Sequence, residues 1–390
     1  MRTAKRQVTK RRVVAIAVAA TVLAGCTSSA KSAAPNVDSH PETKVLYVPP
    51  NPAGTKLGQE NIARFERLVT EGLNQGRLQV MDELLSPTVD DHQNYGPGYP
   101  GMRAGVKGLT AALRTAFPDL HATATTLVAT NDGTQTFAVI KTTGTNTGPY
   151  LGIPPTGKKI ALDIEESARW KDGKMVEHWG VSDNIGLLTQ MGFFPPGSFP
   201  SFNPALLNAK YQDLLKNPRP LHPTAATTVA QKLASVRRAV DVGVNTGDIY
   251  VDSELVSKDY IENEYYGEGF PNGVDRHKDA ITVYRTALPD LHTTINYLAP
   301  IGDGSDTFGI MVAKGTNNGP FLGAPPTGRP VTLDVFEYFH FNKDGKVSVH
   351  NGVADLLGLI AQLGFVPPGS VPVYSPDKVD PQFKAELDLQ

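Results

Sequence analysis

Hydrophobic and polar positions change their period along the chain, and the same change occurs twice. In the first half, apolar residues recur at helical spacing and then alternate with polar residues, as in half-buried strands. Helices followed by an antiparallel meander predict an α+β fold in which the helices pack on one face of a curved sheet. The predicted helices cover residues 57–73, 78–85 and 106–117, and the predicted strands cover about 121–130, 135–145, 158–171 and 175–182.

A second copy of this pattern follows the first. Pro-Asp-Leu-His at 118–121 returns at 289–292, and Gly-Thr-Asn-Thr-Gly-Pro at 144–149 returns as Gly-Thr-Asn-Asn-Gly-Pro at 315–320. Both pairs lie 171 positions apart, and the offset becomes 172 after one inserted residue near Asn342. A register kept over about 150 residues is too long for a solenoid repeat and indicates duplication of a whole domain.

The duplication and the segments around it divide the 390 residues into six parts. We expect a signal peptide at 1–25, a flexible Ser/Ala/Pro-rich tether at 26–56, a first domain at 57–204, a linker with a short helix at 205–224, a second domain at 225–376 and a C-terminal tail at 377–390.

The first 25 residues have the features of a bacterial secretion signal. Six basic side chains precede an apolar run at 13–23, which is too short to span a bilayer as a mature helix. The run closes with Leu-Ala-Gly-Cys, which resembles the lipobox of bacterial lipoproteins, and Cys26 is the only cysteine. The resemblance implies that Cys26 is lipidated and that the protein is exported and anchored to the cell membrane. A cleavage site with an incidental thiol is the alternative, and the export route (Sec or Tat) stays open.

Removal of this signal would make the remaining chain acidic. The segment 1–25 carries six positive charges and no negative ones, so its loss moves the formal net charge from −2 to −8. Phosphate binding needs a basic face, and nucleic acid is therefore excluded as a partner. A single cysteine also excludes a disulfide within the chain, so stability must come from core burial.

Several short motifs then point to a known family. Gly-x-Pro-Pro-Thr-Gly stands at 152–157, Glu-His-Trp stands at 177–179, and Asp183 precedes a closing Gly-Leu-Leu-Thr-Gln-Met-Gly segment. This series resembles the SnoaL-like (polyketide cyclase-like) family of the nuclear transport factor 2-like superfamily, over 57–197 and more loosely over 225–370. The resemblance implies two tandem cone-shaped α+β barrel domains, each with one apolar pocket. In the polyketide cyclases of the family it implies an intramolecular aldol condensation without a cofactor.

Asp183 and Asp355 are the first candidates for chemistry. By the resemblance, each matches the family's acid/base aspartate, which moves a proton at a carbon next to a carbonyl. Burial in an apolar cavity would raise the pKa of such a carboxyl toward the working pH. Each residue also directly precedes a predicted helix, where a helix N-cap is expected and stabilises by about 1 kcal/mol. A capping role alone and a capping role combined with chemistry both stay open.

Glu166 and Glu337 are the second candidates, because strict alternation places each within an apolar stripe of the third predicted strand. A carboxylate in such a place must be paired, hydrogen-bonded or protonated. Either residue could form a carboxyl pair with the aspartate of its domain, lie at a pocket mouth open to water, or be turned out of the stripe by a one-residue bulge. The stripes read Leu162, Ile164, Glu166, Ala168, Trp170 and Leu333, Val335, Glu337, Phe339, Phe341.

Histidines and aromatic residues complete the candidate site. His92 matches the family's histidine after the second helix, but its counterpart is Asn263, so the first domain is expected to be the active one. Strict alternation puts His178 on the opposite strand face from Asp183, which argues against His178 as its partner. The other expected pocket residues are Trp179, His121, His292, Tyr150 and Phe321.

Two functions of different classes fit these features. One is a cyclase- or isomerase-like enzyme that uses Asp183 as acid/base on a hydrophobic carbonyl compound. The other is a non-catalytic envelope lipoprotein that binds a hydrophobic small molecule or a protein partner. The nine histidines show no paired ligand spacing, and no Gly-rich loop precedes a helix, so we expect no metal, nucleotide or other cofactor. The two domains are expected to pair with each other or to form a homodimer.

Overall fold

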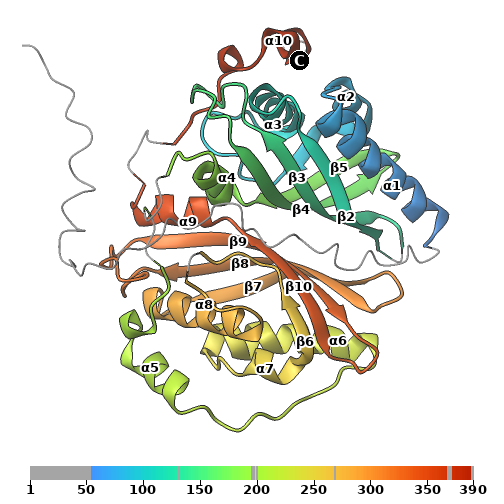
Figure 1. Cartoon of the computed structure of the whole chain (residues 1–390). Helices are drawn as coiled ribbons and strands as arrows, with labels where there is room; N and C mark the ends of the chain where they lie inside the picture. Colours follow the sequence, from blue (N-terminus) through green and yellow to red (C-terminus); the bar gives the residue numbers. More distant parts are fainter. Residues whose placement is uncertain are drawn as a thin grey trace, which may run out of the picture. The chain divides into compact units, whose positions relative to one another are not determined.

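A computed structural model describes residues 54–387 except 131, 195–197, 199–200, 268 and 367–370. Cys26, the expected signal peptide and most of the expected tether lie outside the described residues. Two five-stranded sheets, each with its own helices, form the described chain (Figure 1). The described helices include none with both the length and the apolar character needed to cross a membrane.

In the first repeat, helices lead into a mixed sheet with the strand order β1-β5-β4-β3-β2. Strand β1 runs parallel to β5, and the other neighbours are antiparallel. The elements are α1 (Lys56–Arg67), the π-helix η1 (Leu68–Asn74), α2 (Gln79–Leu84), β1 (Leu85–Asp91), α3 (Met102–Ala116), β2 (His121–Ala129), β3 (Gln135–Thr145), β4 (Lys159–Lys171), β5 (Lys174–Ser182) and α4 (Asn184–Gln190).

The second repeat has the same order of elements and the sheet order β6-β10-β9-β8-β7. A short linker precedes it, with the 3-10 helix η2 (Pro204–Leu206) and α5 (Ala209–Lys216). The elements of the repeat are α6 (Val229–Arg238), η3 (Ala239–Val244), α7 (Val251–Leu255), β6 (Val256–Glu262), α8 (Val274–Ala287), β7 (His292–Ile301), β8 (Asp306–Thr316), β9 (Pro330–Phe341), β10 (Val347–Ala354) and α9 (Leu356–Leu363). Two short helices close the described chain, η4 (Pro376–Lys378) and α10 (Pro381–Leu387).

The predicted α+β class, the three helices and the four antiparallel strands of the first repeat are confirmed. Strand β1 was missed, because Pro87 and the polar residues around it hide its short alternating pattern. It is paired only with β5, about 90 residues further along the chain, and no local signal reports such a parallel pairing. This missed strand carries functional side chains of the site described below.

Both faces of each sheet are buried, by different partners. The helices cover one face, where the predicted stripe of Leu162, Ile164, Ala168 and Trp170 joins the main core. On the other face the two sheets pack against each other through aromatic and branched side chains. Phe137 of β3 contacts Phe308 of β8 there, with ring centroids 4.1 Å apart.

The segment that follows each repeat packs on the other repeat. In the linker, the backbone N–H of Asn208 donates a hydrogen bond to Thr286 Oγ1 of α8 (3.3 Å). After the second repeat, the backbone N–H of Asp380 donates in the same way to Thr115 Oγ1 of α3 (2.9 Å), and α10 lies beside α3 (Figure 1). Asn208 and Asp380 occupy equivalent positions, 172 residues apart, so the exchange is reciprocal.

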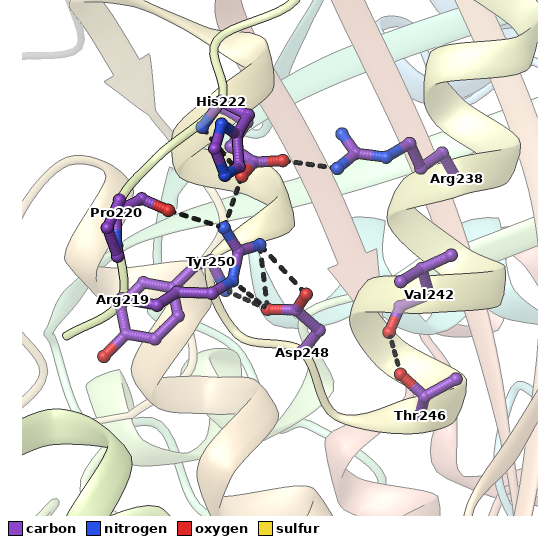
Figure 2. Close-up of polar contacts among 9 residues, drawn as sticks. Arg219, Pro220, His222, Arg238, Val242, Thr246, Asp248 and Tyr250 are labelled. Atoms are coloured by element: carbon purple, nitrogen blue, oxygen red, sulfur yellow. Dashed lines mark hydrogen bonds and ion pairs between the residues drawn. The ribbon is translucent and has the colours of Figure 1, made fainter. Parts of the chain in front are cut away.

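An ion-pair network fastens the remainder of the linker to the second repeat (Figure 2). Arg219 binds Asp248 (2.9 Å) and Glu254 (2.5 Å), and Arg238 binds the second oxygen of Glu254. Burial alone raises the pKa of Glu254, but the hydrogen bonds from the two guanidinium groups outweigh it and lower the pKa to about 2. Glu254 is therefore ionised at neutral pH and holds the linker in place.

Candidate acid-base site in an apolar cavity

The second repeat encloses a cavity of about 80 Å³ between its helices and the inner face of its sheet. Most of its wall is apolar, with Ile281, Met311 and Leu333 among the lining residues. The ionisable groups in the wall are Glu264, Tyr266, His277, Tyr284 and Glu337. A largely apolar cavity with a few polar groups has the character of a small-molecule site.

A carboxylate–imidazole–carboxylate chain lies at the cavity. Strand β6 runs parallel to β10, and its register places Glu262 opposite His350. His350 Nδ1 lies 2.8 Å from Glu262 Oε1, while its Nε2 contacts Glu337 Oε2 of β9. Burial lowers the pKa of His350, but the two carboxylates outweigh this effect and raise it well above its usual value. His350 is therefore an imidazolium at neutral pH and neutralises the neighbouring carboxylate charge.

Glu264 lies beside this chain and differs from the other carboxyl groups in its protonation. It follows β6, is 3% exposed, and accepts a hydrogen bond from the Tyr266 hydroxyl. Burial, followed by the negative charge of Glu337, raises the pKa of Glu264 to about 8. A Cβ at position 352 would lie 2.5 Å from Glu264 Oε2 and 2.8 Å from Glu337 Oε2, so only Gly352 leaves room for both carboxyl groups.

The first repeat holds a smaller cavity, of about 50 Å³, with a related chain. His178 Nδ1 lies 2.9 Å from Asp91 Oδ1, and its Nε2 lies 3.8 Å from Glu166 Oε2. Burial lowers the pKa of His178, but the hydrogen bond that it donates to Asp91 and the negative charges of Asp91 and Glu166 outweigh this effect and raise the pKa to about 10. Gln93 occupies the position of Glu264, so this cavity has a neutral amide where the second has a carboxyl group.

The structure places the predicted carboxylates in two different environments. Glu166 and Glu337 line the cavities, as the apolar stripes predict. Asp183 and Asp355 line neither of them. Each caps a helix, accepting a hydrogen bond from the backbone N–H three residues later (2.8 and 2.9 Å). Burial raises the pKa of Asp183 to about 6, yet its charged neighbours are Lys141 and Asp163, on the sheet face turned away from the cavity.

The reason lies in which face of β5 points inward. Alternation puts Asp183 with Trp179 and Val181, and this set belongs to the face that meets the other sheet. The register pairs His178 with Ala168 of the core stripe, so His178 is on the cavity face. The alternation argument separates the two faces correctly, and the structure puts His178, not Asp183, on the cavity face.

The other predicted site residues lie away from these two cavities. The side chain of His92 is 41% exposed and stacks on Trp179, with ring centroids 5.0 Å apart. The preference for the first repeat, which depended on His92, therefore has no support in the geometry. His121 and His292 are exposed at strand starts, Tyr150 is buried against Phe117, and Phe321 packs near Tyr284 and Phe365.

The residues that sequence reasoning missed come mainly from β1 and β6 and from the turns after them. In the first repeat, Asp91, Gln93 and Tyr95 alternate toward the cavity, which leaves His92 on the outside. The same alternation at Glu262, Glu264 and Tyr266 could have identified the site, had the strand been recognised.

Two groups among the described residues have donor atoms close enough to share a metal ion. Asp90, His92 and Glu177 form an exposed group, and Glu262, Glu264 and His350 form a buried one. In the buried group, His350 and Glu262 already bind each other through a hydrogen bond. A cation there would have to replace that bond.

Helices against the inner face of a five-stranded sheet, with a cavity between them in each repeat, define the class of cone-shaped α+β domains. The sequence pattern of the SnoaL-like polyketide cyclase matches residues 63–191 and 234–363, so the chain belongs to this family, with two tandem copies. No curated protein gives a significant match.

Solved structures of single-domain length align with parts of the chain. IdmH from Streptomyces antibioticus shares 31% identity over 34% of this chain and 99% of its own, with a TM-score of 0.30. AclR from Streptomyces galilaeus shares 26% identity over 36% of this chain and 88% of its own, with a TM-score of 0.32. TsrD from Streptomyces laurentii shares 26% identity over 35% and 96%, with a TM-score of 0.30.

Proposed function

We propose that the second repeat binds a small, largely apolar carbonyl compound and transfers a proton at the carbon next to the carbonyl group. The single observation that carries this proposal is the carboxyl group of Glu264 in the wall of a largely apolar cavity. A pKa of about 8 lets this group both release and accept a proton near neutral pH, which suits general acid–base catalysis.

The surrounding residues support this role for Glu264. In its protonated form, the carboxyl group can donate a hydrogen bond to a carbonyl oxygen, and in its ionised form it can take the adjacent C–H proton. Glu337 is paired with the His350 imidazolium, which offsets part of its charge. The apolar wall excludes water and strengthens these interactions.

A second candidate function, binding without chemistry, fits the first repeat. Gln93 replaces the proton-transfer carboxyl there, and its Nε2 donates a hydrogen bond to Ser182 Oγ (3.1 Å). The two repeats would then divide the work, with one holding a ligand and the other acting on it.

Hydrogen–deuterium exchange tests the proposal directly. Cyclohexanone is incubated in D2O with the purified full-length chain, and loss of its α-proton signal is followed by NMR. We expect exchange above the buffer rate that increases with pH through about 8, as Glu264 loses its proton. Glu264→Gln should reduce the rate about 100-fold or more. The control Glu66→Gln, on an exposed helix position, should leave it unchanged.

Binding of the same ketone is measured separately by saturation-transfer NMR. Binding with wild-type exchange in Glu264→Gln would remove Glu264 from the chemistry and leave only the binding function. Absence of both binding and exchange in the wild-type chain would refute the proposal for the cavity as a whole.

We also propose that the chain is exported and anchored to the bacterial cell membrane through a lipid on Cys26. The basic residues, the apolar run and the Leu-Ala-Gly-Cys sequence support this proposal. Expressed in a bacterium with labelled palmitate, the wild-type chain should take up label and enter the detergent phase, whereas Cys26→Ala should do neither. Equal labelling and partitioning of the two would contradict lipidation.

A further inference from the structure

The cavity of the second repeat has an imidazole in its wall that is separate from the His350 chain. His277 projects from α8, and its Nδ1 lies 3.0 Å from Asp252 Oδ2 of α7. Asp252 is 7% exposed, so this pair is shielded from solvent. The His277 ring centroid lies 5.6 Å from that of His350 and 6.0 Å from that of Tyr266. The His277 imidazole and the Glu264 carboxyl group thus line one cavity, and the His350 ring lies behind them.

This pair has no equivalent in the first repeat. At the same positions, 171 residues earlier, the chain has Val106 and Met81, and both line the smaller cavity. The repeats share the other carboxylate–imidazole chain, so the common fold does not require the His277–Asp252 pair. Together with Glu264, it separates the chemistry of the second cavity from that of the first.

We propose that His277 is a second proton-transfer residue of this cavity and that Asp252 is its positioning residue. The inference rests on the proposed function and assigns it two groups instead of one. The ion pair with Asp252 keeps a proton on His277 Nδ1, so Nε2 is the nitrogen that exchanges a proton with a ligand. Among the described residues, Asp252 is the only ion-pair partner of His277, and it contacts Nδ1, so Nε2 is available for this purpose.

The two groups together complete an enolisation. The ionised Glu264 carboxylate takes the proton from the carbon next to the carbonyl, and the C–H electron pair forms the C=C bond of the enol. The carbonyl π pair moves to oxygen, which takes the proton from His277 Nε2, so no net charge remains on the ligand. Return of a proton from Glu264 to the same or a conjugated carbon, and of the enol proton to His277, restores both residues. The ligand class is therefore an enolisable ketone or aldehyde.

The charges around His277 favour its protonated form. Burial lowers its pKa, but the Asp252 carboxylate outweighs this and raises the pKa to about 9, so the imidazolium is present at neutral pH. The positive charge of His350 opposes this increase in the pKa of His277, and the negative charge of Glu262 supports it. The ionisable groups around His277 come from α7, β6 and the turn after it, α8, β9 and β10, and are Asp252, Tyr260, Glu262, Glu264, Tyr266, Tyr284, Glu337 and His350.

The test replaces His277 and measures exchange and binding of cyclohexanone on the full-length chain. His277→Val introduces the side chain that the first repeat has at the equivalent position, Val106. His277→Gln keeps a polar side chain of similar size and serves as the second variant if His277→Val does not fold. Both variants should bind the ketone and lose about 100-fold in exchange rate. The matched control His292→Gln alters an exposed histidine of the same repeat and should keep the wild-type rate.

Asp252→Asn tests the positioning role of Asp252 with a measurement that would not change if Asp252 only stabilised the fold. The imidazole titration of His277, followed by its 15N resonances, should shift to lower pH in this variant, and the decline of the exchange rate near pH 9 should shift with it. Wild-type exchange in both His277 variants would overturn this inference and leave the role of Glu264 intact. Absence of exchange in the wild-type chain would overturn the proposed function and the inference with it.

Discussion

Glu165 is a buried carboxyl group between the two sheets, and its replacement gives a sharp test of the domain packing. Strand β4 points it away from the cavity, where the register pairs it with Val139 and Val181. Its side chain is 1% exposed, and its Oε2 has no hydrogen-bond partner. Burial, followed by the charge of Glu337, raises its pKa well above the usual value, so the folded protein holds this carboxyl group protonated.

The cost of this protonation follows from the pH. In the unfolded chain, Glu165 ionises near 4.5, so a pH of 7 lies about 2.5 units above that value. At 1.36 kcal/mol per unit, keeping the group protonated in the folded state costs about 3 kcal/mol. Because the folded pKa is raised, this penalty is absent below pH 4.5 and grows as the pH rises toward the folded pKa.

Glu165→Leu should remove the penalty and add an apolar contact. We expect the free energy of unfolding to increase by about 3 kcal/mol at pH 7 and to change by less than about 1 kcal/mol at pH 4.5. Urea unfolding followed by tryptophan fluorescence measures it, because Trp170 and Trp179, the only tryptophans, both lie in the first repeat. Glu66→Leu is the exposed control. The same pH dependence in wild type and Glu165→Leu would refute the assignment of a protonated carboxyl group to this interface.

Three further predictions concern the linker, the cavity and the helix cap. Glu254→Gln should lower the melting temperature at pH 7, because it removes a carboxylate partner of Arg219. The lowered pKa of Glu254 means that this stabilisation is complete above pH 4.5 and is lost as the pH falls through about 2. Scanning calorimetry should therefore show the melting temperatures of wild type and variant converging in strong acid. Gly352→Ala should lower the free energy of unfolding in urea by about 1–3 kcal/mol and abolish ketone exchange, because the added methyl group would clash with the Glu264 carboxyl group. A stable variant with normal exchange would show that the site has more room than the structure gives it. Asp183→Asn should keep both the helix cap and the exchange rate, whereas Asp183→Ala should lose about 1 kcal/mol of stability and keep the exchange rate. A loss of exchange in Asp183→Asn would show that Asp183 takes part in proton transfer.

The duplication shows how one fold can hold two different sites. The carboxylate–imidazole chains of the repeats are equivalent, with Asp91, His178 and Glu166 in one and Glu262, His350 and Glu337 in the other. The two repeats differ in the residues of the surrounding wall, and these residues determine which proton-transfer groups each cavity has. Such changes cost little stability as long as each buried polar group keeps a partner.

Local pattern alone determined much of this protein. The 171-residue repeat, the α+β class, four strands of the first repeat and the caps at Asp183 and Asp355 all follow from spacing along the chain. These features depend on neighbours within a few residues, or on identical residues at a fixed distance, and a sequence displays both.

Only the tertiary structure decided which face of β5 becomes the inner wall. Alternation separates His178 from Asp183 but does not say which is inside, because helices bury one sheet face and the second sheet buries the other. An apolar pattern is therefore present on both faces, and hydrophobicity gives no direction. The parallel strand that brings Asp91 to His178 joins residues 87 positions apart, and such a pairing is fixed by the packing of the whole domain.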